Sequence, residues 1–349
     1  MIRRHTSGVA SKKTIAPSPD QETFEQLAEQ YRGEIQLHCY RMLGSIHDAE
    51  DVVQETFLRA WRGLGGFEGR TSFRNWLYRI ATNACLSFLA RHANARRVLP
   101  EMQGPPVDFS PLSAPDAEIA WLEPYPDAAL EGIADGEPGP EARYETHEAI
   151  RLAFIAAIQE LPARQRAVLL LREVVGWSAS ETAALLEASV ASVNSAMQRA
   201  RATLGDRFPS GRPSRMTAPD DRQHKLLERY VKTWEDSDVD GFVALLRDDA
   251  VWSMPPWPQW YVGRGTIREF MAWVWRPGRT LRHHLVRTAA NGRPAFGLYK
   301  SERDELDWHP FAVQVLELGD DTIACVTNFV DARLFTAFGL PQVLPKKNR

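Results

Sequence analysis

The stretch SASETAALLEASVASVNSAMQRAR, residues 178–201, contains two helical patterns separated by a short break at residues 187–189. Ser178 and Glu181 have the spacing of a capping box, in which each side chain accepts a hydrogen bond from the backbone N–H of the other residue. Ser189 can cap the start of the second helix through its hydroxyl group. Because two helices joined by a turn of about three residues form a helix-turn-helix, the sequence predicts that motif here.

The second helix of this motif has one apolar and one polar face. The apolar residues recur at helical spacing and are predicted to be buried; they are Val193, Met197, Ala200 and Leu204. The opposite face carries hydroxyl, amide and guanidinium groups, which bind base edges and phosphates in DNA complexes. These outward-facing residues are Ser192, Asn194, Ser195, Gln198, Arg199 and Arg201. A solvated helix face would have the same pattern, so the surrounding sequence must decide between the two interpretations.

The composition indicates a globular protein of two or three domains. At 349 residues the chain is longer than one average domain, and 44% hydrophobic residues allow each domain its own core. A net charge of -3 argues against a nonspecific polycation, so any nucleic-acid contact must be local. Three cysteines without a C-x-x-C pair disfavour a disulfide framework and a zinc site. Since no apolar run approaches the roughly 20 residues of a membrane span and no signal peptide is evident, we predict a cytoplasmic protein without membrane contact.

The pattern of apolar residues divides the chain into helical, acidic and β-rich segments. Residues 99–140 contain no Lys or Arg and are rich in Pro, Gly and acidic residues, so we expect an anionic, unstructured linker. After residue 221 two helical stretches precede short β-rich runs, which predicts an α+β domain. The predicted organisation is a disordered tail (1–21), a helical domain (22–98), the acidic linker (99–140), a second helical domain (141–208), a short linker (209–221), the α+β domain (222–341) and a tail (342–349).

Three segments outside the helix-turn-helix carry a family resemblance. The segment LPARQRAVLLLREV (161–174), followed by the helix-turn-helix, resembles region 4 of bacterial group 4, or extracytoplasmic-function, sigma factors. The segments DAEDVVQETFLRAW (48–61) and FRNWLYRIATNAC (73–85) resemble regions 2.2 and 2.3–2.4 of the same family. Two independent motifs in the right order, separated by a linker, make residues 22–207 similar to a sigma factor.

The resemblance implies that region 2 contacts both polymerase and the -10 element of promoters. In the family, region 2.2 binds a coiled coil of the polymerase β′ clamp, and the matching residues here are Asp51, Gln54, Glu55 and Leu58. We expect Phe57 and Trp61 to be core residues of the same helix. Regions 2.3 and 2.4 bind the opened -10 strand in the family, with a flipped base in a pocket. The matching residues are Arg74, Arg79 and Asn83, whereas Trp76, Leu77 and Ile80 have core spacing.

The resemblance also assigns roles to region 4 and to the linker. Region 4 binds the polymerase β flap and reads the -35 duplex in the family, with contacts at the positions of Asn194, Ser195 and Arg199. A basic residue is common where Asn194 stands and an arginine where Ala196 stands, so fewer cations should weaken phosphate binding here. The family's linker passes toward the RNA exit path of polymerase, and the acidic charge of residues 99–140 fits a basic channel. The aromatic segment WLEPYPD (121–127) either packs on the chain's own domains or contacts polymerase.

Residues 222–341 resemble the SnoaL/NTF2-like fold, which closes a curved sheet with helices around a pocket. A minority of sigma factors have such a domain, which implies regulation of the factor in cis. The fold also includes enzymes, and six residues could supply an acid/base pair: His283, His284, His309, Asp304, Asp307 and Asp331. Five tryptophans could line an apolar pocket for an unknown small ligand: Trp252, Trp257, Trp260, Trp273 and Trp308.

We therefore predict a sigma factor that is not an enzyme and needs no cofactor or metal, because fold alone does not imply chemistry. Its predicted partners are core RNA polymerase and promoter DNA. Two alternatives stay open at this stage. One is a ligand-responsive DNA-binding regulator that never joins polymerase, and the other is an NTF2-like enzyme with a DNA-binding appendage.

Overall fold

The computed structural model describes residues 21–67, 69, 71–92, 96–131, 133, 150–207, 220–302 and 305–346. The first 20 residues of the predicted tail (1–21) lie outside the described residues, whereas Gln21 is the first residue of a helix. Most of the short linker after residue 208 also lies outside them. The same holds for residues 134–149, which include the end of the acidic linker and the start of the second helical domain. Within the described part, no helix combines the length and the hydropathy needed to cross a membrane.

The first helical domain contains α1 (Gln21–Leu43), α2 (Ile46–Gly63) and α3 (Phe73–Arg91). Serine residues begin two of these helices, because the hydroxyl group of Ser45 accepts from the Asp48 N–H and that of Ser72 from the Asn75 N–H. The helices pack around residues that are almost fully buried, among them Ile35, Tyr40 and Leu77.

The second helical domain contains the predicted helix-turn-helix. Its helices are α5 (Leu152–Gln159), α6 (Ala163–Leu169), which continues as a π-helix over Leu170–Val174, α7 (Ala179–Leu185) and α8 (Val190–Arg207). The capping box is confirmed, since Ser178 Oγ accepts from the Glu181 N–H at 3.1 Å and Glu181 Oε2 accepts from the Ser178 N–H at 2.7 Å. The cap of α8 is also confirmed, with Ser189 Oγ accepting from the Ser192 N–H at 3.1 Å.

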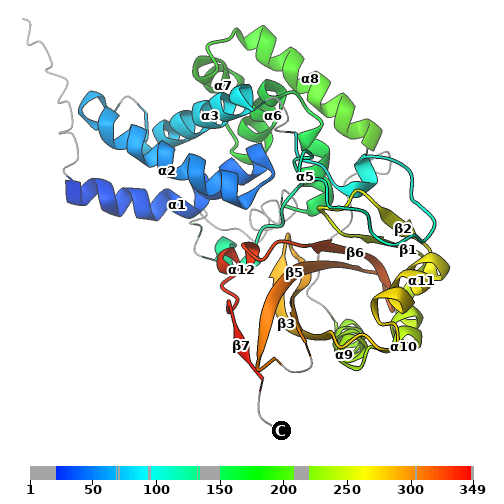
Figure 1. Cartoon of the computed structure of the whole chain (residues 1–349). Coiled ribbons are helices and arrows are strands. Elements are labelled where there is room, and N and C mark those ends of the chain that lie inside the picture. The colour runs from blue at the N-terminus through cyan, green and yellow to red at the C-terminus, as the bar shows by residue number, and fades with distance from the viewer. Residues whose placement is uncertain are drawn as a thin grey trace, which may run out of the picture.

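The C-terminal domain consists of a curved sheet and helices that pack against it (Figure 1). The sheet strands are β1 (Leu246–Ser253), β2 (Trp260–Val262), β3 (Arg282–Ala290), β4 (Arg293–Ser301), β5 (Asp307–Leu318), β6 (Ile323–Phe329) and β7 (Leu344–Pro345). The helices are α9 (Asp221–Asp236), α10 (Val239–Ala244), α11 (Arg264–Val274) and the short α12 (Leu334–Ala337). The strand order is β2-β1-β6-β5-β4-β3, with β7 on β5, and the pairs are antiparallel except β1 with β6.

The sheet has two apolar faces. On β5, alternate residues such as Ala312 and Leu316 join the cluster inside the domain, beneath α9, α10 and α11. The intervening residues Val313 and Val315 face outward, where they share one hydrophobic cluster with both helical domains. The predicted fold class, two all-α parts followed by an α+β domain, is confirmed, and the predicted strands correspond to β1, β3, β4, β5 and β6. Strands β2 and β7 are too short to give a periodic signal.

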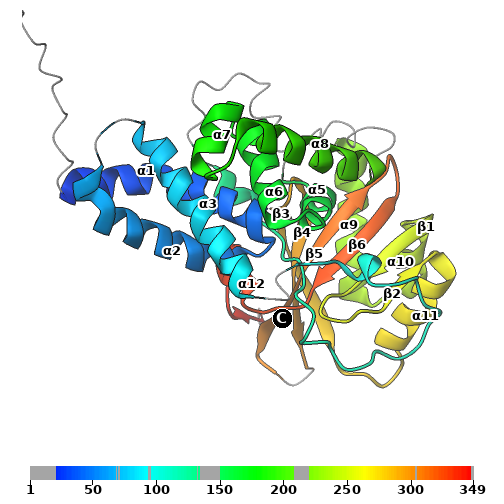
Figure 2. The same cartoon turned by 90° about the horizontal axis from the view of Figure 1, so that it is seen from above.

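The acidic linker is ordered over residues 99–131, so the prediction of an unstructured segment is wrong there. Figure 2 shows it following the C-terminal domain past β2 and α11. The Val107 N–H donates to Trp260 O at 3.0 Å, and the indole N–H groups of Trp257 and Trp260 donate to carbonyls of Ser113 and Gly104. The linker residues Phe109 and Leu112 pack against the interior cluster of this domain. Composition measures only the apolar surface that a segment can bury by itself, and another domain supplies the rest here.

Candidate polymerase and nucleic-acid interfaces

Helix α2 presents one exposed stripe that includes most of the residues predicted to bind polymerase. Asp51 and Gln54 are exposed, and the side chain of Leu58 is 50% exposed. Glu55 is half-buried, with its Oε1 accepting from Arg59 Nε at 2.6 Å. A single exposed leucine is common on protein surfaces, so Leu58 supports a protein partner only together with its neighbours on this stripe.

Trp61 extends this stripe, and the prediction that it is a core residue is wrong. Its side chain is 43% exposed, while Phe57 is buried as predicted. One part of the indole ring packs on Phe24, with ring centroids 5.2 Å apart. Because positions 54, 58 and 61 are four and seven residues apart, Gln54, Leu58 and Trp61 share one face of α2. Tryptophan combines a large apolar ring with a polar N–H, so helical spacing alone could not decide between core and interface.

On α3 the structure separates the three residues predicted to bind the -10 strand. Arg79 and Asn83 are exposed and four residues apart, so they share one face of the helix. Arg74 instead donates from Nε to Glu34 Oε2 at 3.0 Å, and its guanidinium group lies 5.1 Å from the Tyr78 ring. A phosphate contact by Arg74 would therefore require it to leave Glu34. Leu77 is fully buried, as its spacing predicts.

On α8 the structure places every residue predicted to bind the -35 element on the surface. Ser192, Asn194, Ser195, Gln198, Arg199 and Arg201 are all exposed. Val193, Met197 and Ala200 form the buried face, and Ala196 joins them with 9% exposure. Arg201 Nε donates to Glu173 Oε1 at 2.8 Å, yet its side chain remains 65% exposed. The helix therefore offers a continuous face of hydroxyl, amide and guanidinium groups, as DNA reading requires.

The two helical domains are joined by a buried arginine that sequence reasoning missed. Arg166 on α6 is 3% exposed and donates to Met42 O at the end of α1. Its other acceptors are Ile158 O at 2.9 Å, Gln159 O at 2.9 Å, Leu161 O at 3.2 Å and the side-chain oxygen of Gln159. Burial lowers the pKa of Arg166 to about 9. The only available sequence signal was one arginine within an otherwise apolar helix face, which does not identify its partners.

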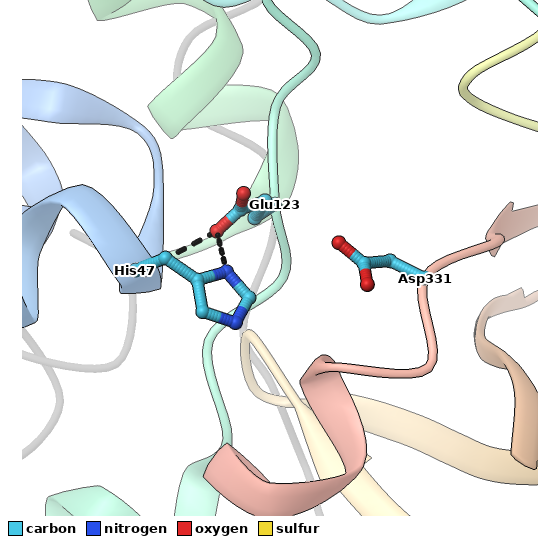
Figure 3. A group of neighbouring side chains, drawn as sticks. All are labelled: His47, Glu123 and Asp331. Carbon is cyan, nitrogen blue, oxygen red and sulfur yellow. Dashed lines mark hydrogen bonds and ion pairs between the residues drawn. The ribbon is translucent and has the colours of Figure 1, made fainter.

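The linker contacts the start of α2 through Glu123 (Figure 3). One carboxylate oxygen of Glu123 accepts from Ser45 Oγ at 2.8 Å, from the Ile46 N–H at 2.9 Å and from His47, whose Nδ1 lies 3.0 Å away. The hydrogen bond to Glu123 raises the pKa of His47. Burial raises the pKa of Glu123, but the bonds from His47 and the charge of Arg97 together lower it. This carboxylate thus acts as an N-terminal cap for α2.

The side chains of His47, Glu123 and Asp331 are close enough to be considered as metal ligands. Their ligand atoms lie within 4.8 Å of one another. However, one Glu123 oxygen is occupied by hydrogen bonds from α2, and Asp331 is paired with Arg333. Figure 3 shows Asp331 facing this pair from the loop that follows β6. The residues present fit a charge cluster between the linker and two domains better than a metal site.

The described candidate acid/base residues have different surroundings in the C-terminal domain, and no hydrogen bond or ion pair joins two of them there. His283 is buried inside the domain, where burial and then Arg279 and Lys300 lower its pKa to about 4. His284 pairs with Glu235 at 2.9 Å, and Asp331 lies at the linker. His309 is exposed on β5, Asp307 begins that strand, and Asp304 lies outside the described residues.

The tryptophans likewise do not line one common pocket. Trp252 is buried in the domain, stacked on Trp234 with centroids 6.1 Å apart. Trp257 and Trp260 bind the linker, and Trp273 lies between Phe109 of the linker and two arginine side chains. Trp308 packs beside His284.

Comparisons with known families divide the chain as the structure does. Residues 27–95 match the model for Sigma-70 region 2, residues 151–204 the model for Sigma-70 region 4, and residues 227–323 the model for the SnoaL-like domain. The chain is 42% identical over 327 residues to the "ECF RNA polymerase sigma factor SigG" of Mycobacterium tuberculosis, covering 92% of this chain and 85% of that protein. It is 30% identical over 185 residues to the "ECF RNA polymerase sigma factor SigW" of Bacillus subtilis, covering 53% of this chain and 88% of that protein.

A solved structure shows the same overall fold. The crystal structure of the Mycobacterium tuberculosis extracytoplasmic function sigma factor SigJ aligns with a TM-score of 0.53. The alignment covers 91% of this chain and 99% of that chain at 17% identity. The likeness therefore includes the C-terminal domain as well as both helical domains.

Proposed function

Because the chain belongs to the family of extracytoplasmic-function RNA polymerase sigma factors, which direct polymerase to promoters, we propose that α2, α3 and α8 divide the steps of initiation among them. In this proposal α2 binds the β′ clamp coiled coil of core polymerase through Asp51, Gln54, Glu55 and Leu58, and Trp61 completes the contact. Region 4 binds the β flap. Such a factor acts in the cytoplasm, where polymerase and the chromosome are.

DNA recognition is assigned to the other two helices. Arg79 and Asn83 on α3 contact the opened -10 strand, joined by Arg74 if the strand draws it from Glu34. On α8, Asn194, Ser195 and Arg199 contact the -35 duplex, with Ser192, Gln198 and Arg201 beside them. The observation that carries this proposal is the exposure of all six of these α8 residues above a fully apolar opposite face. A regulator that never joins polymerase would not need the polar and apolar stripe on α2.

Replacing Arg199 with alanine is expected to weaken binding of the polymerase–factor complex to its -35 element by about tenfold, because a guanidinium contact to a base or phosphate is lost. The salt dependence should also become shallower, by about one unit in slope if the contact is to a phosphate. The measurement is a titration of a promoter fragment at several salt concentrations, using a promoter found by sequencing transcripts after overexpression. Arg229→Ala, on the exposed face of α9, is the control. Equal affinities for the two variants would contradict the assignment of α8.

We also propose that the C-terminal domain regulates the factor in cis and is not an enzyme. Two observations support this: the linker binds along its surface, and its candidate acid/base residues are dispersed. Removing residues 215–349 is expected to change runoff transcription several-fold at limiting polymerase, because the linker and the outer sheet face lose their contacts. Unchanged transcription together with unchanged polymerase affinity would remove the regulatory role. A substrate screen on the full chain addresses the enzymatic alternative.

A further inference from the structure

The turn between β3 and β4 connects the C-terminal domain with α1, the linker and the residue just before α5. Asn291 and Gly292 form this turn with φ angles of +52° and +68°, a left-handed conformation that asparagine and glycine adopt most readily. Figure 1 shows this end of the sheet directed toward the helical regions. Asn291 is nevertheless fully buried, which is unusual for a hairpin turn.

The side chain of Asn291 hydrogen-bonds three separate segments through both of its N–H groups and its carbonyl oxygen. Its Nδ2 donates to Tyr40 Oη of α1 at 3.0 Å and to Ile150 O, just before α5, at 2.5 Å. Its Oδ1 accepts from the Tyr125 N–H of the linker at 2.9 Å. An amide side chain has two N–H donors and one carbonyl oxygen, so all three are engaged only when region 2, the linker and region 4 are assembled around it.

Neighbouring contacts strengthen the same junction. The Asn291 N–H donates to Tyr125 O at 2.9 Å, and the Gly292 N–H donates to Asp127 Oδ1 at 2.8 Å. The rings of Tyr40 and Tyr125 lie 4.7 Å apart, and the Tyr40 hydroxyl donates to Glu123 O at 2.9 Å. The hairpin of the C-terminal domain therefore binds both the linker and α1 directly.

The end of α1 is also where region 4 contacts region 2. The last carbonyls of a helix lack partners within it, and here Arg41 O accepts from Gln159 Nε2 at 3.2 Å while Met42 O accepts from Arg166. Residues 40, 41 and 42 thus bind the C-terminal domain and two helices of region 4 in succession. A further contact joins Tyr78 and Trp177, with centroids 6.1 Å apart.

This closed arrangement conflicts with simultaneous use of both DNA-reading faces. Elements at -10 and -35 are about 25 base pairs apart, which is roughly 85 Å of duplex at 3.4 Å per base pair. Regions 2 and 4 share one hydrophobic cluster in the closed arrangement. Reaching both elements requires the two regions to separate, and separation breaks the contacts of Asn291 with Tyr40 or Ile150.

We propose that Asn291 is a latch that holds regions 2 and 4 together in an arrangement that cannot initiate transcription, and that initiation proceeds after Asn291 releases Tyr40 and Ile150. This inference rests on the proposed regulation in cis. It adds that the regulation is inhibitory and that Asn291 is the residue responsible. The latch is specific because the buried amide has these three protein partners only in the closed arrangement, whereas water satisfies it in the open one.

The test replaces Asn291 with glycine in the full chain. Glycine retains the left-handed turn and removes all three side-chain hydrogen bonds. The matched control is Ser237→Gly, since Ser237 has a φ of +54° at the end of α9, outside this junction. Asn291→Asp is a second variant, because a carboxylate keeps the size of the side chain but cannot donate to Ile150 O.

Two measurements separate the latch from the function of the factor. Without polymerase, hydrogen exchange in α5 and at the end of α1 should become about tenfold faster in Asn291→Gly, and the radius of gyration by X-ray scattering should increase. Runoff transcription at limiting factor should rise several-fold over wild type. The latch would be overturned if either Asn291 variant had the same hydrogen-exchange rates and the same radius of gyration as Ser237→Gly. If the wild type failed to bind polymerase, the proposed function would be wrong. The latch would still be tested, because hydrogen exchange is measured without polymerase.

Discussion

The double substitution Gln54→Ala and Leu58→Ala is expected to weaken binding of core RNA polymerase by about 30-fold, corresponding to about 2 kcal/mol. Both side chains lie on the exposed stripe of α2 and contribute little to its buried face. Exposed positions of this kind usually change the free energy of unfolding by less than about 0.5 kcal/mol. The loss should therefore appear in polymerase affinity, measured by fluorescence anisotropy of labelled factor, while the thermal unfolding midpoint stays close to wild type.

The matched control for this experiment is Leu306→Ala. Leu306 is 79% exposed and precedes β5 in the C-terminal domain. The substitution therefore removes the same side-chain atoms as Leu58→Ala, at a position far from α2 in the sequence. We expect polymerase affinity to be unchanged by this substitution. Addition of Trp61→Ala to the double variant should reduce affinity further, because tryptophan is among the residues that contribute most at interfaces. Wild-type affinity in the double variant would show that α2 is not the contact.

The helix-turn-helix could be predicted in detail because its determinants are local. Ser178 and Glu181 fix the start of α7, Ser189 caps α8, and the buried positions repeat at helical spacing, so each signal lies within a few residues of the feature it determines. The exposure of the -35 face followed from the same periodicity. The family resemblance added which partner each face meets, and periodicity alone could not distinguish that partner from solvent.

The order of the linker and the junction around Asn291 could not be predicted, because their determinants are far apart in the sequence. Phe109 finds its apolar surroundings near α11, and Glu123 finds its donors at the start of α2. An Asn-Gly pair between two β-rich runs indicates a hairpin. It does not indicate that the asparagine is buried against Tyr40, which lies 251 residues earlier. Trp61 shows the same limit, since its position fits both a core and an interface.

Arg166→Ala is expected to destabilise region 4 and its contact with the end of α1 by about 3 kcal/mol, because it leaves several buried acceptors without a donor. Alanine removes the donors to Met42 O, to three carbonyls at the end of α5 and in the loop that follows it, and to the Gln159 side chain. Water cannot replace the guanidinium group without entering the site, since Arg166 is 3% exposed. Arg166→Lys should be intermediate, because an ammonium group has three donors and cannot match five acceptors arranged around a planar guanidinium.

Hydrogen exchange of α5 and α6 in the full chain measures this effect, since a loss of about 3 kcal/mol corresponds to roughly 150-fold faster exchange through local opening. Arg164→Ala is the control on the same helix. Arg164 is exposed and donates one hydrogen bond, to Leu186 O, so we expect a cost below about 0.5 kcal/mol. Similar exchange in the two variants would show that the buried guanidinium does not hold region 4. A large difference would show that the buried guanidinium stabilises α5 and α6, together with its contact with the end of α1.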